Sequence, residues 1–171
     1  MAYVDTNVLI SYYFDEEEFH EVSTRIFNML KTMQKKIYIS PLTLIELYSV
    51  IARNLSKYRL PPHYMVLDEK GKIHVLVKDI LEYSKPILAD DESKLELLDK
   101  SSVFHIYKKA IDYVATLKLK SLDLMHITYA IELAKRGLVD TFITLDKKLM
   151  KELISKRQVL EGLGLKVVDF S

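Results

Sequence analysis

Two distant stretches of the sequence follow one pattern, and that pattern restricts the fold more than any other feature. "AYVDTN" begins at Ala2 and "TFITLD" begins at Thr141; in each, a short run suited to a buried strand ends at an acid. A helical pattern follows each acid. Short apolar strands that alternate with helices are typical of a parallel sheet. The sequence therefore predicts an α/β fold.

The rest of the chain continues this alternation. Strands are predicted at residues 2–4, 36–39, 141–144 and 165–170. Helices are predicted at residues 7–14, 19–34, 42–58, 103–117, 122–137 and 147–157, where apolar residues recur at helical spacing. The expected helix starts are Thr6 or Asn7, Ser40 followed by Pro41, and Asp146, because such residues suit a first turn with free N–H groups.

The middle of the chain fits two patterns. Residues 65–77, "MVLDEKGKIHVLV", predict a hairpin that turns at Lys70 and Gly71, whereas residues 75–85, "VLVKDILEYSK", fit a helix. Residues 93–100 are expected to form a short helix. The choice between hairpin and helix stays open from the sequence alone.

Composition excludes several classes of function. The 171 residues are the size of one domain, and a net charge of +1 means that any nucleic-acid binding must come from a local basic patch. The absence of Cys excludes disulfides, a Cys-based zinc site and thiol chemistry. No apolar run reaches membrane-spanning length and no signal peptide is recognisable, so we expect a cytoplasmic protein without membrane contact. The acidic runs at residues 15–18 and 90–92 are expected to be solvated helix starts.

Three acids differ in what their positions predict. Asp5 and Asp146 follow predicted strands, where parallel sheets bind ligands, but each also precedes a helix and is alternatively an N-cap. On a helical wheel, Asp123 lies at the centre of an apolar arc beside Ile127, with Thr128 on the opposite side. A carboxylate that points inward needs donors, a cation or a wet cleft, which indicates a site. An Asp satisfied by backbone groups is the alternative.

Helical wheels give a different result for Glu46 and His126. Glu46 shares its side of the helix with Thr43 and lies opposite Tyr48, so the pattern alone predicts a residue on a polar, exposed face. His126 lies at the edge of the arc around Asp123, which favours a packed or supporting residue over a metal ligand. The sequence contains no Walker loop, Gly-rich dinucleotide turn or metal-ligand spacing of His.

Four stretches together resemble the acidic motifs of PIN-domain ribonucleases, including VapC-type toxins. They are "YVDTNVLI", "SPLTLIEL", "SLDLMHITYA" and "FITLDKKL", in this order from residue 3 to about residue 150. The resemblance implies a three-layer α/β sandwich, with a central parallel sheet of about four to five short strands flanked by helices. It assigns metal-binding and catalytic roles to four acids and supporting roles to three neighbours: Asp5, Glu46, Asp123 and Asp146, with Thr6, Asn7 and Thr144.

The resemblance also bears on organisation and partners. It implies one PIN-like nuclease domain over residues 1–171. Compact members of the family are shorter between the Glu helix and the Asp helix, so a family-atypical insertion is predicted within residues 56–119. RNA, a second copy in a homodimer and a cognate antitoxin protein are the partners that the resemblance implies.

Four carboxylates without a predicted His or Cys ligand suit a hard cation with oxygen ligands. Mg²⁺ or Mn²⁺ is therefore expected, and zinc is not. An acidic cleft needs cationic side chains nearby to hold phosphate groups. The candidates for binding RNA are Lys147, Lys148, Lys151 and Lys120, with solvated helix faces as the alternative interpretation.

The leading hypothesis is a metal-dependent endoribonuclease that hydrolyses RNA phosphodiester bonds, either as the toxin of a toxin–antitoxin pair or as a housekeeping nuclease. The alternative is a non-catalytic module that binds RNA or a partner and retains the acidic pocket. A phosphatase or receiver-like domain is a third hypothesis, but the sequence lacks a second acid two residues after Asp5.

Overall fold

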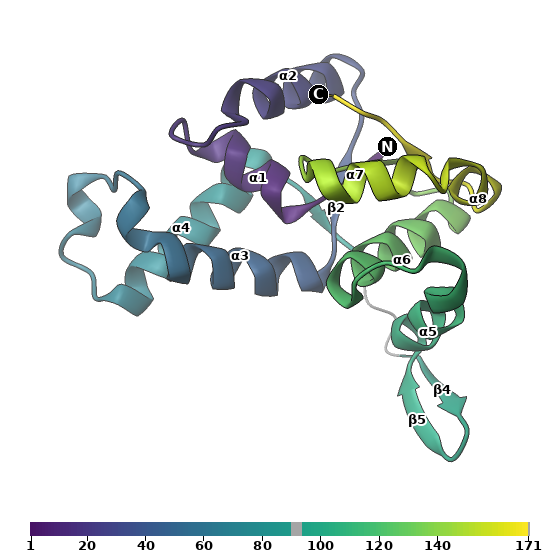
Figure 1. The fold of residues 1–171 in the computed structure, drawn as a ribbon. Helices are drawn as coiled ribbons and strands as arrows, with labels where there is room; N and C mark the ends of the chain where they lie inside the picture. The colour runs from purple at the N-terminus through teal and green to yellow at the C-terminus, as the bar shows by residue number, and fades with distance from the viewer. Residues whose placement is uncertain (90–93, 171) are drawn as a thin grey trace.

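A parallel sheet lies at the centre of the computed structural model, which describes residues 1–89 and 94–170 (Figure 1). Its five strands lie in the order β3-β2-β1-β6-β7, and each neighbouring pair is parallel. The strands are β1 (Ala2–Val4), β2 (Ile37–Ile39), β3 (Ile87–Leu88), β6 (Thr141–Ile143) and β7 (Lys166–Val167). The predicted α/β sheet of four to five short strands is confirmed.

Helices cover both faces of this sheet, as expected for a three-layer sandwich. One apolar core lies between the sheet and α1 (Thr6–Tyr13), α2 (His20–Thr32), α3 (Pro41–Asn54) and α4 (Glu69–Ser84). The other lies between the sheet and α5 (His105–Leu117), α6 (Ser121–Lys135), α7 (Lys147–Ile154) and α8 (Arg157–Gly162). Two short 3₁₀ helices, η1 (Leu55–Lys57) and η2 (Pro62–Tyr64), lie between α3 and α4.

The alternation of side chains along β1 explains the two cores. Ala2 and Val4 point into the first core and Tyr3 into the second, because successive residues of a strand face opposite sides. Because helices cover both faces, all three residues are fully buried. The Tyr3 hydroxyl group is satisfied by a hydrogen bond of 2.7 Å with Ser40 Oγ.

The predicted hairpin at Lys70 and Gly71 is wrong, and the helical alternative is confirmed. Both residues lie in the first turn of α4, where the Asp68 side chain accepts a hydrogen bond from Gly71 N at 2.7 Å. This capping bond stabilises a helix start that a Gly would otherwise weaken.

The hairpin of this chain lies further on, in place of the short helix predicted at 93–100. Strands β4 (Leu95–Leu98) and β5 (Ser101–Phe104) pair in antiparallel fashion and extend away from the rest of the molecule beyond α5 (Figure 1). Asp99, in the turn, has a φ of 51°, a conformation that Asp adopts more readily than most residues. The strand character of β5 also explains why α5 begins at His105 rather than at 103.

Other boundaries differ by a few residues. The first helix is capped by Asp5 rather than by Thr6 or Asn7, and the last strand spans two residues instead of the predicted 165–170. Residues 15–18 precede α2, which begins at His20. The acidic run at 90–92 lies outside the described residues. Within the described chain, no helix combines the length and apolar character needed to cross a membrane.

The sheet order places a switch in direction between β1 and β6. From β1 the chain moves to β2 and β3 on one side, whereas β6 continues to β7 on the other. Ligands of open parallel sheets bind at the carboxyl ends of the strands beside such a point. Asp5 and Thr144 follow these two strands directly.

Candidate functional site

Four acids from separate elements line one cleft at the carboxyl edge of the sheet. Asp5 follows β1, Glu46 belongs to α3, Asp123 to the first turn of α6, and Asp146 caps α7. The cleft has a volume of about 350 Å³, and all four acids line it together with His126. The structure therefore brings together every acid that the resemblance selected.

Asp5 is both a helix cap and a member of this cluster. Its Oδ1 accepts a hydrogen bond of 2.7 Å from Thr6 N, and its Oδ2 accepts bonds from Thr144 Oγ1 at 2.7 Å and Asn7 Nδ2 at 3.0 Å. The residue is only 8% exposed. Burial raises the pKa of Asp5 and the charge of Glu46 raises it further, although His126 and Thr144 oppose this shift. The capping interpretation is thus confirmed, and the same residue also belongs to the acidic cluster.

The supporting residues hold this arrangement in place. Asn7 also bonds Thr144 Oγ1 at 3.1 Å, and its Oδ1 accepts a hydrogen bond of 3.1 Å from Leu145 N. The Thr6 hydroxyl group donates to Glu46 rather than capping the helix. Asn7 and Thr144 therefore fix the orientation of Asp5, and Thr6 fixes that of Glu46.

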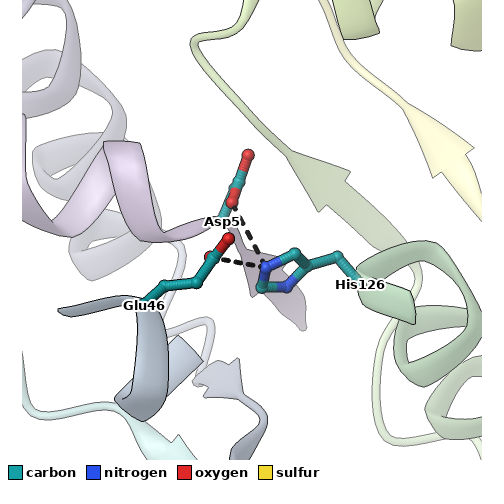
Figure 2. A group of neighbouring side chains, drawn as sticks. All are labelled: Asp5, Glu46 and His126. Atoms are coloured by element: carbon teal, nitrogen blue, oxygen red, sulfur yellow. Dashed lines mark hydrogen bonds and ion pairs between the residues drawn. The ribbon is translucent and has the colours of Figure 1, made fainter. Parts of the chain in front are cut away.

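His126 lies between two of the acids (Figure 2). Its Nε2 is 2.7 Å from Glu46 Oε2 and 3.8 Å from Asp5 Oδ1. Burial raises the pKa of Glu46, but the hydrogen bond and charge of His126 and the hydroxyl group of Thr6 outweigh it, so the net shift is downward. Asp5 and Glu46 thus have pKa shifts of opposite sign, which favours an ionised Glu46 beside a more basic Asp5.

The other nitrogen of the His126 ring faces Tyr3. Nδ1 lies 2.8 Å from the Tyr3 hydroxyl group, which in turn contacts Ser40 Oγ. Burial lowers the pKa of His126, but the hydrogen bond with Glu46 and the charges of Asp5 and Asp123 outweigh it, so its pKa is raised. Without a bound cation, an imidazolium in this environment compensates the negative charge of the buried acids.

Asp123 is partly buried, as its inward-facing position on the helical wheel predicted, and it lines the cleft with the other acids. Burial raises its pKa, and the charges of Asp5 and Asp146 raise it further. The predicted polar side of α6 is wrong at Thr128, which is fully buried and donates to Leu124 O at 2.7 Å. Because α5 packs along α6 while the sheet covers another side, little of this helix reaches solvent.

The wheel for α3 was wrong at two of the positions that flank Glu46. Thr43, on the side predicted to be exposed, is fully buried, whereas Tyr48, on the predicted apolar side, is exposed. Glu46 lies at the boundary with a side chain that is 18% exposed. It can therefore reach the cleft and still contact water.

Asp146 occupies the outer rim of the cluster. It is exposed, and its Oδ1 accepts hydrogen bonds from Lys148 N at 2.8 Å and Leu149 N at 3.0 Å. Both are the capping bonds that the sequence predicted for a helix start. Its second carboxylate oxygen forms neither of these capping bonds.

Sequence patterns missed several residues of the cleft wall, among them a group held together by an ion pair and a hydrogen bond. Lys57 Nζ forms an ion pair of 2.7 Å with Glu17 Oε1, which also accepts a hydrogen bond of 3.0 Å from the Tyr58 hydroxyl group. Glu17 belongs to the acidic run predicted to be a solvated helix start. Nothing in the spacing of residues 17 and 57 signals that the fold brings them together. His126 had a signal, because it follows Asp123 by one helical turn.

The four lysines proposed to bind RNA occupy different places. Lys147 and Lys151 line a groove next to the cleft, and the Lys120 charge lowers the pKa of Asp123, against the larger effects of burial and the acids. Lys148 is exposed, and its backbone N–H group takes part in capping α7.

The donor set of the cluster fits a divalent cation. The cluster offers three ligand atoms that lie within 4.8 Å of one another, one each from Asp5, Glu46 and His126. Two carboxylates surrounded by further acids suit a hard cation, and the imidazole adds one nitrogen donor. These three residues could therefore bind a metal, and His126 joins a set that was predicted to consist of acids alone.

Comparison with known families agrees with this arrangement. The family model described as PIN domain matches residues 2–153, which includes all four acids. No curated protein matches the chain. PIN domains are generally nucleases and usually use a divalent metal. The chain belongs to the PIN-domain family.

Proposed function

We propose that this protein is a metal-dependent endoribonuclease that hydrolyses phosphodiester bonds of RNA. The observation that carries the proposal is the convergence of Asp5, Glu46, Asp123 and Asp146 on one cleft. Three of them, Asp5, Glu46 and Asp123, are partly or fully buried in this cleft, an arrangement that is costly without a compensating cation or donor set. Buried acids that carry such a free-energy cost are typical of functional sites.

Each acid has its own part in the proposed reaction. A bound Mg²⁺ or Mn²⁺ would supply an activated water and would offset the charge on the attacked phosphate. Asp5, Glu46 and Asp123 would hold the cation, with Thr144 and Asn7 keeping Asp5 in place. Asp146, at the rim, would orient the attacking water. The water oxygen bonds to phosphorus while the bond from phosphorus to the 3′ oxygen breaks, which leaves a 5′-phosphate and a 3′-hydroxyl group.

The test measures cleavage of labelled RNA by the purified protein in Mg²⁺ or Mn²⁺, with EDTA as a control. Asp5→Asn and Asp123→Asn should abolish cleavage. Asp112→Asn is the matched control, because Asp112 is an exposed acid of α5 that pairs with Lys108. Cleavage that persists in Asp5→Asn or in EDTA would show that a contaminant is responsible and would overturn the proposal.

A second candidate is a binding module without catalysis. His126 favours it, because its hydrogen bond to Glu46 already compensates the acids within the chain. This candidate predicts that Mn²⁺ raises the melting temperature while no RNA is cut under any condition. Turnover that depends on Asp123 would exclude it.

A role as the toxin of a toxin–antitoxin pair is a further proposal, and so is a cytoplasmic location. The proposed partners are RNA and an antitoxin that covers the acidic cleft. Induced expression of the wild type should arrest growth of a host cell, and Asp5→Asn should not. Equal growth with both proteins would favour a housekeeping nuclease.

A further inference from the structure

A second groove adjoins the acidic cleft. It has a volume of about 490 Å³ and lies between α2, α7 and the C-terminal residues. Figure 1 shows the end of the chain running from α8 toward α2. Asp146 lines both the groove and the cleft, so the two adjoin at this residue.

The groove differs from the cleft in its chemistry. Its walls are largely apolar and include two aromatic rings, whereas acids dominate the cleft; the apolar lining residues are Phe19, Val22, Leu145, Met150, Ile154 and Phe170. Flat, mostly apolar ligands with a few polar groups suit such a pocket.

Cations stand beside these apolar walls. Lys147 Nζ lies 5.0 Å from the centre of the Phe19 ring, and Lys151, one turn further along α7, also lines the groove. Both lysines are exposed, so their ammonium groups remain available to a phosphate. Asp169 also lines the groove. A pocket with apolar walls and two lysines at one side matches a nucleotide, which combines an aromatic base with a phosphate.

We propose that this groove is a nucleobase-binding subsite for single-stranded RNA. It receives the base of the nucleotide next to the scissile phosphate, whose neighbouring phosphate contacts Lys147 and Lys151. The inference rests on the proposed function, because the shared residue Asp146 places the groove beside the acids, and Thr144 of the groove donates a hydrogen bond to Asp5. A base in a duplex is stacked on its neighbours, so an unpaired strand is the form that fits.

The test measures binding and not turnover. The probe is a short single-stranded RNA that carries 2-aminopurine at one position, bound in Mg²⁺ to protein with Asp123→Asn so that it is not cut. Quenching of the 2-aminopurine fluorescence reports a base in contact with an aromatic ring, and anisotropy gives the affinity. A matched RNA with an abasic nucleotide at that position should bind about 5-fold more weakly or worse.

Two surface variants locate the contact. Ile154 of α7 is 41% exposed and lines the groove, whereas Val159 of α8 is 39% exposed and does not. Ile154→Asp should abolish the quenching and the preference for the base, and Val159→Asp should leave both unchanged. Equal affinity for abasic and normal RNA, or equal loss in both variants, would overturn the subsite.

The outcomes also separate this inference from the proposed function. Base-dependent binding that Ile154→Asp removes would support the subsite even if the wild type cuts no RNA. Conversely, RNA cleavage that does not distinguish normal from abasic substrate would overturn the subsite and leave the nuclease proposal standing. Displacement of the RNA probe by unrelated peptides with equal potency would indicate a peptide groove and would also overturn it.

Discussion

The Nε2 atom of His126 lies 2.7 Å from Glu46 Oε2 and 3.8 Å from Asp5 Oδ1, so one imidazole contacts acids from two other elements. Glu46 comes from α3, Asp5 from the end of β1, and His126 from α6, which packs on the opposite face of the sheet from α1. The ring therefore links the layers at the point where negative charge is concentrated. A bound cation would compensate the same charge.

Loss of this ring should destabilise the protein, and a metal should reverse part of the loss. We expect His126→Asn to lower the free energy of unfolding by about 3 kcal/mol without metal, because it leaves buried acids uncompensated. Mn²⁺ should then stabilise the variant at least as much as the wild type. Urea unfolding with and without Mn²⁺ measures both effects. His105→Asn is the control, since His105 pairs with Glu96 outside the cleft. A variant that Mn²⁺ no longer stabilises would instead identify His126 as a required ligand.

The hydroxyl group of Thr144 should tune metal affinity without touching the metal. It donates to Asp5 Oδ2 at 2.7 Å, and partners of this kind typically change affinity by about 10- to 100-fold. Thr144→Val should weaken Mn²⁺ binding by about 10-fold, as measured by calorimetry. Thr144→Ser keeps the hydroxyl group and should bind almost as the wild type does. Equal weakening in both variants would attribute the effect to packing.

Capping and catalysis can be separated at Asp146. Its Oδ1 accepts the capping bonds of α7, and an Asn side chain preserves such an acceptor. Asp146→Asn should therefore retain stability while RNA cleavage falls. Asp146→Ala should lose cleavage and also about 1 kcal/mol of stability. Full cleavage activity in Asp146→Asn would limit the residue to the capping role.

Local sequence patterns gave the best predictions where a single residue determines the start of a helix or the side of a helix that faces inward. Pro41 after Ser40 marks the start of α3, and the capping box between Ser40 and Thr43 confirms it. Asp123 was also predictable, because an acid within an apolar arc conflicts with burial unless it has a function. In both cases the signal lies within a few residues of sequence.

Tertiary packing explains the failures. Which side of α3 is covered depends on α4 and the sheet, so the wheel could not place Tyr48 or Thr43 correctly. The hairpin of β4 and β5 lacks an Asn-Gly or Asp-Gly turn, and its alternation over 95–98 is too short to distinguish from a helix. Whether residues 56–119 are a family insertion stays a prediction.

A half-buried acid on the far side of α6 should give the protein a measurable acid sensitivity. Burial raises the pKa of Glu132, but hydrogen bonds from Lys135 at 2.8 Å and Tyr113 at 3.0 Å outweigh it, so the pKa is lowered. A carboxyl group with a lowered pKa in the folded state stabilises the protein above its unfolded pKa of about 4.3. The stabilising contribution of Glu132 disappears as the pH falls through the lower pKa that this residue has in the folded state.

Glu132→Gln should therefore reduce the free energy of unfolding by about 1 kcal/mol at pH 7, and the difference should shrink below about pH 4. Denaturant unfolding at a series of pH values measures it. Glu161→Gln is the control, because Glu161 is exposed and its ion pair with Arg157 is long, at 3.9 Å. A Glu132→Gln difference that stays constant with pH would mean that packing, and not charge, is responsible.

One apolar surface has no covering element among residues 1–89 and 94–170. It spans the hairpin and the adjacent side of α5, with side chains 47% to 73% exposed: Leu95, Leu97, Phe104, Tyr107, Ile111 and Val114. Leu95 and Leu97 lie on one face of the hairpin. On the same face, they pair across the two strands with Phe104 and Ser102, respectively. Large exposed apolar surfaces of this kind usually contact another molecule.

We predict that a second copy of the chain covers this surface in the homodimer that the family resemblance implies. Within the described chain the outer edges of β4 and β5 are unpaired, and identical antiparallel strands can pair about a two-fold axis. Leu97→Asp and Ile111→Asp should each convert the dimer to a monomer in light scattering after size exclusion. Val66→Asp, at an 86% exposed position outside this surface, should leave the dimer intact. A wild-type monomer, or a dimer that survives both charged substitutions, would contradict the prediction.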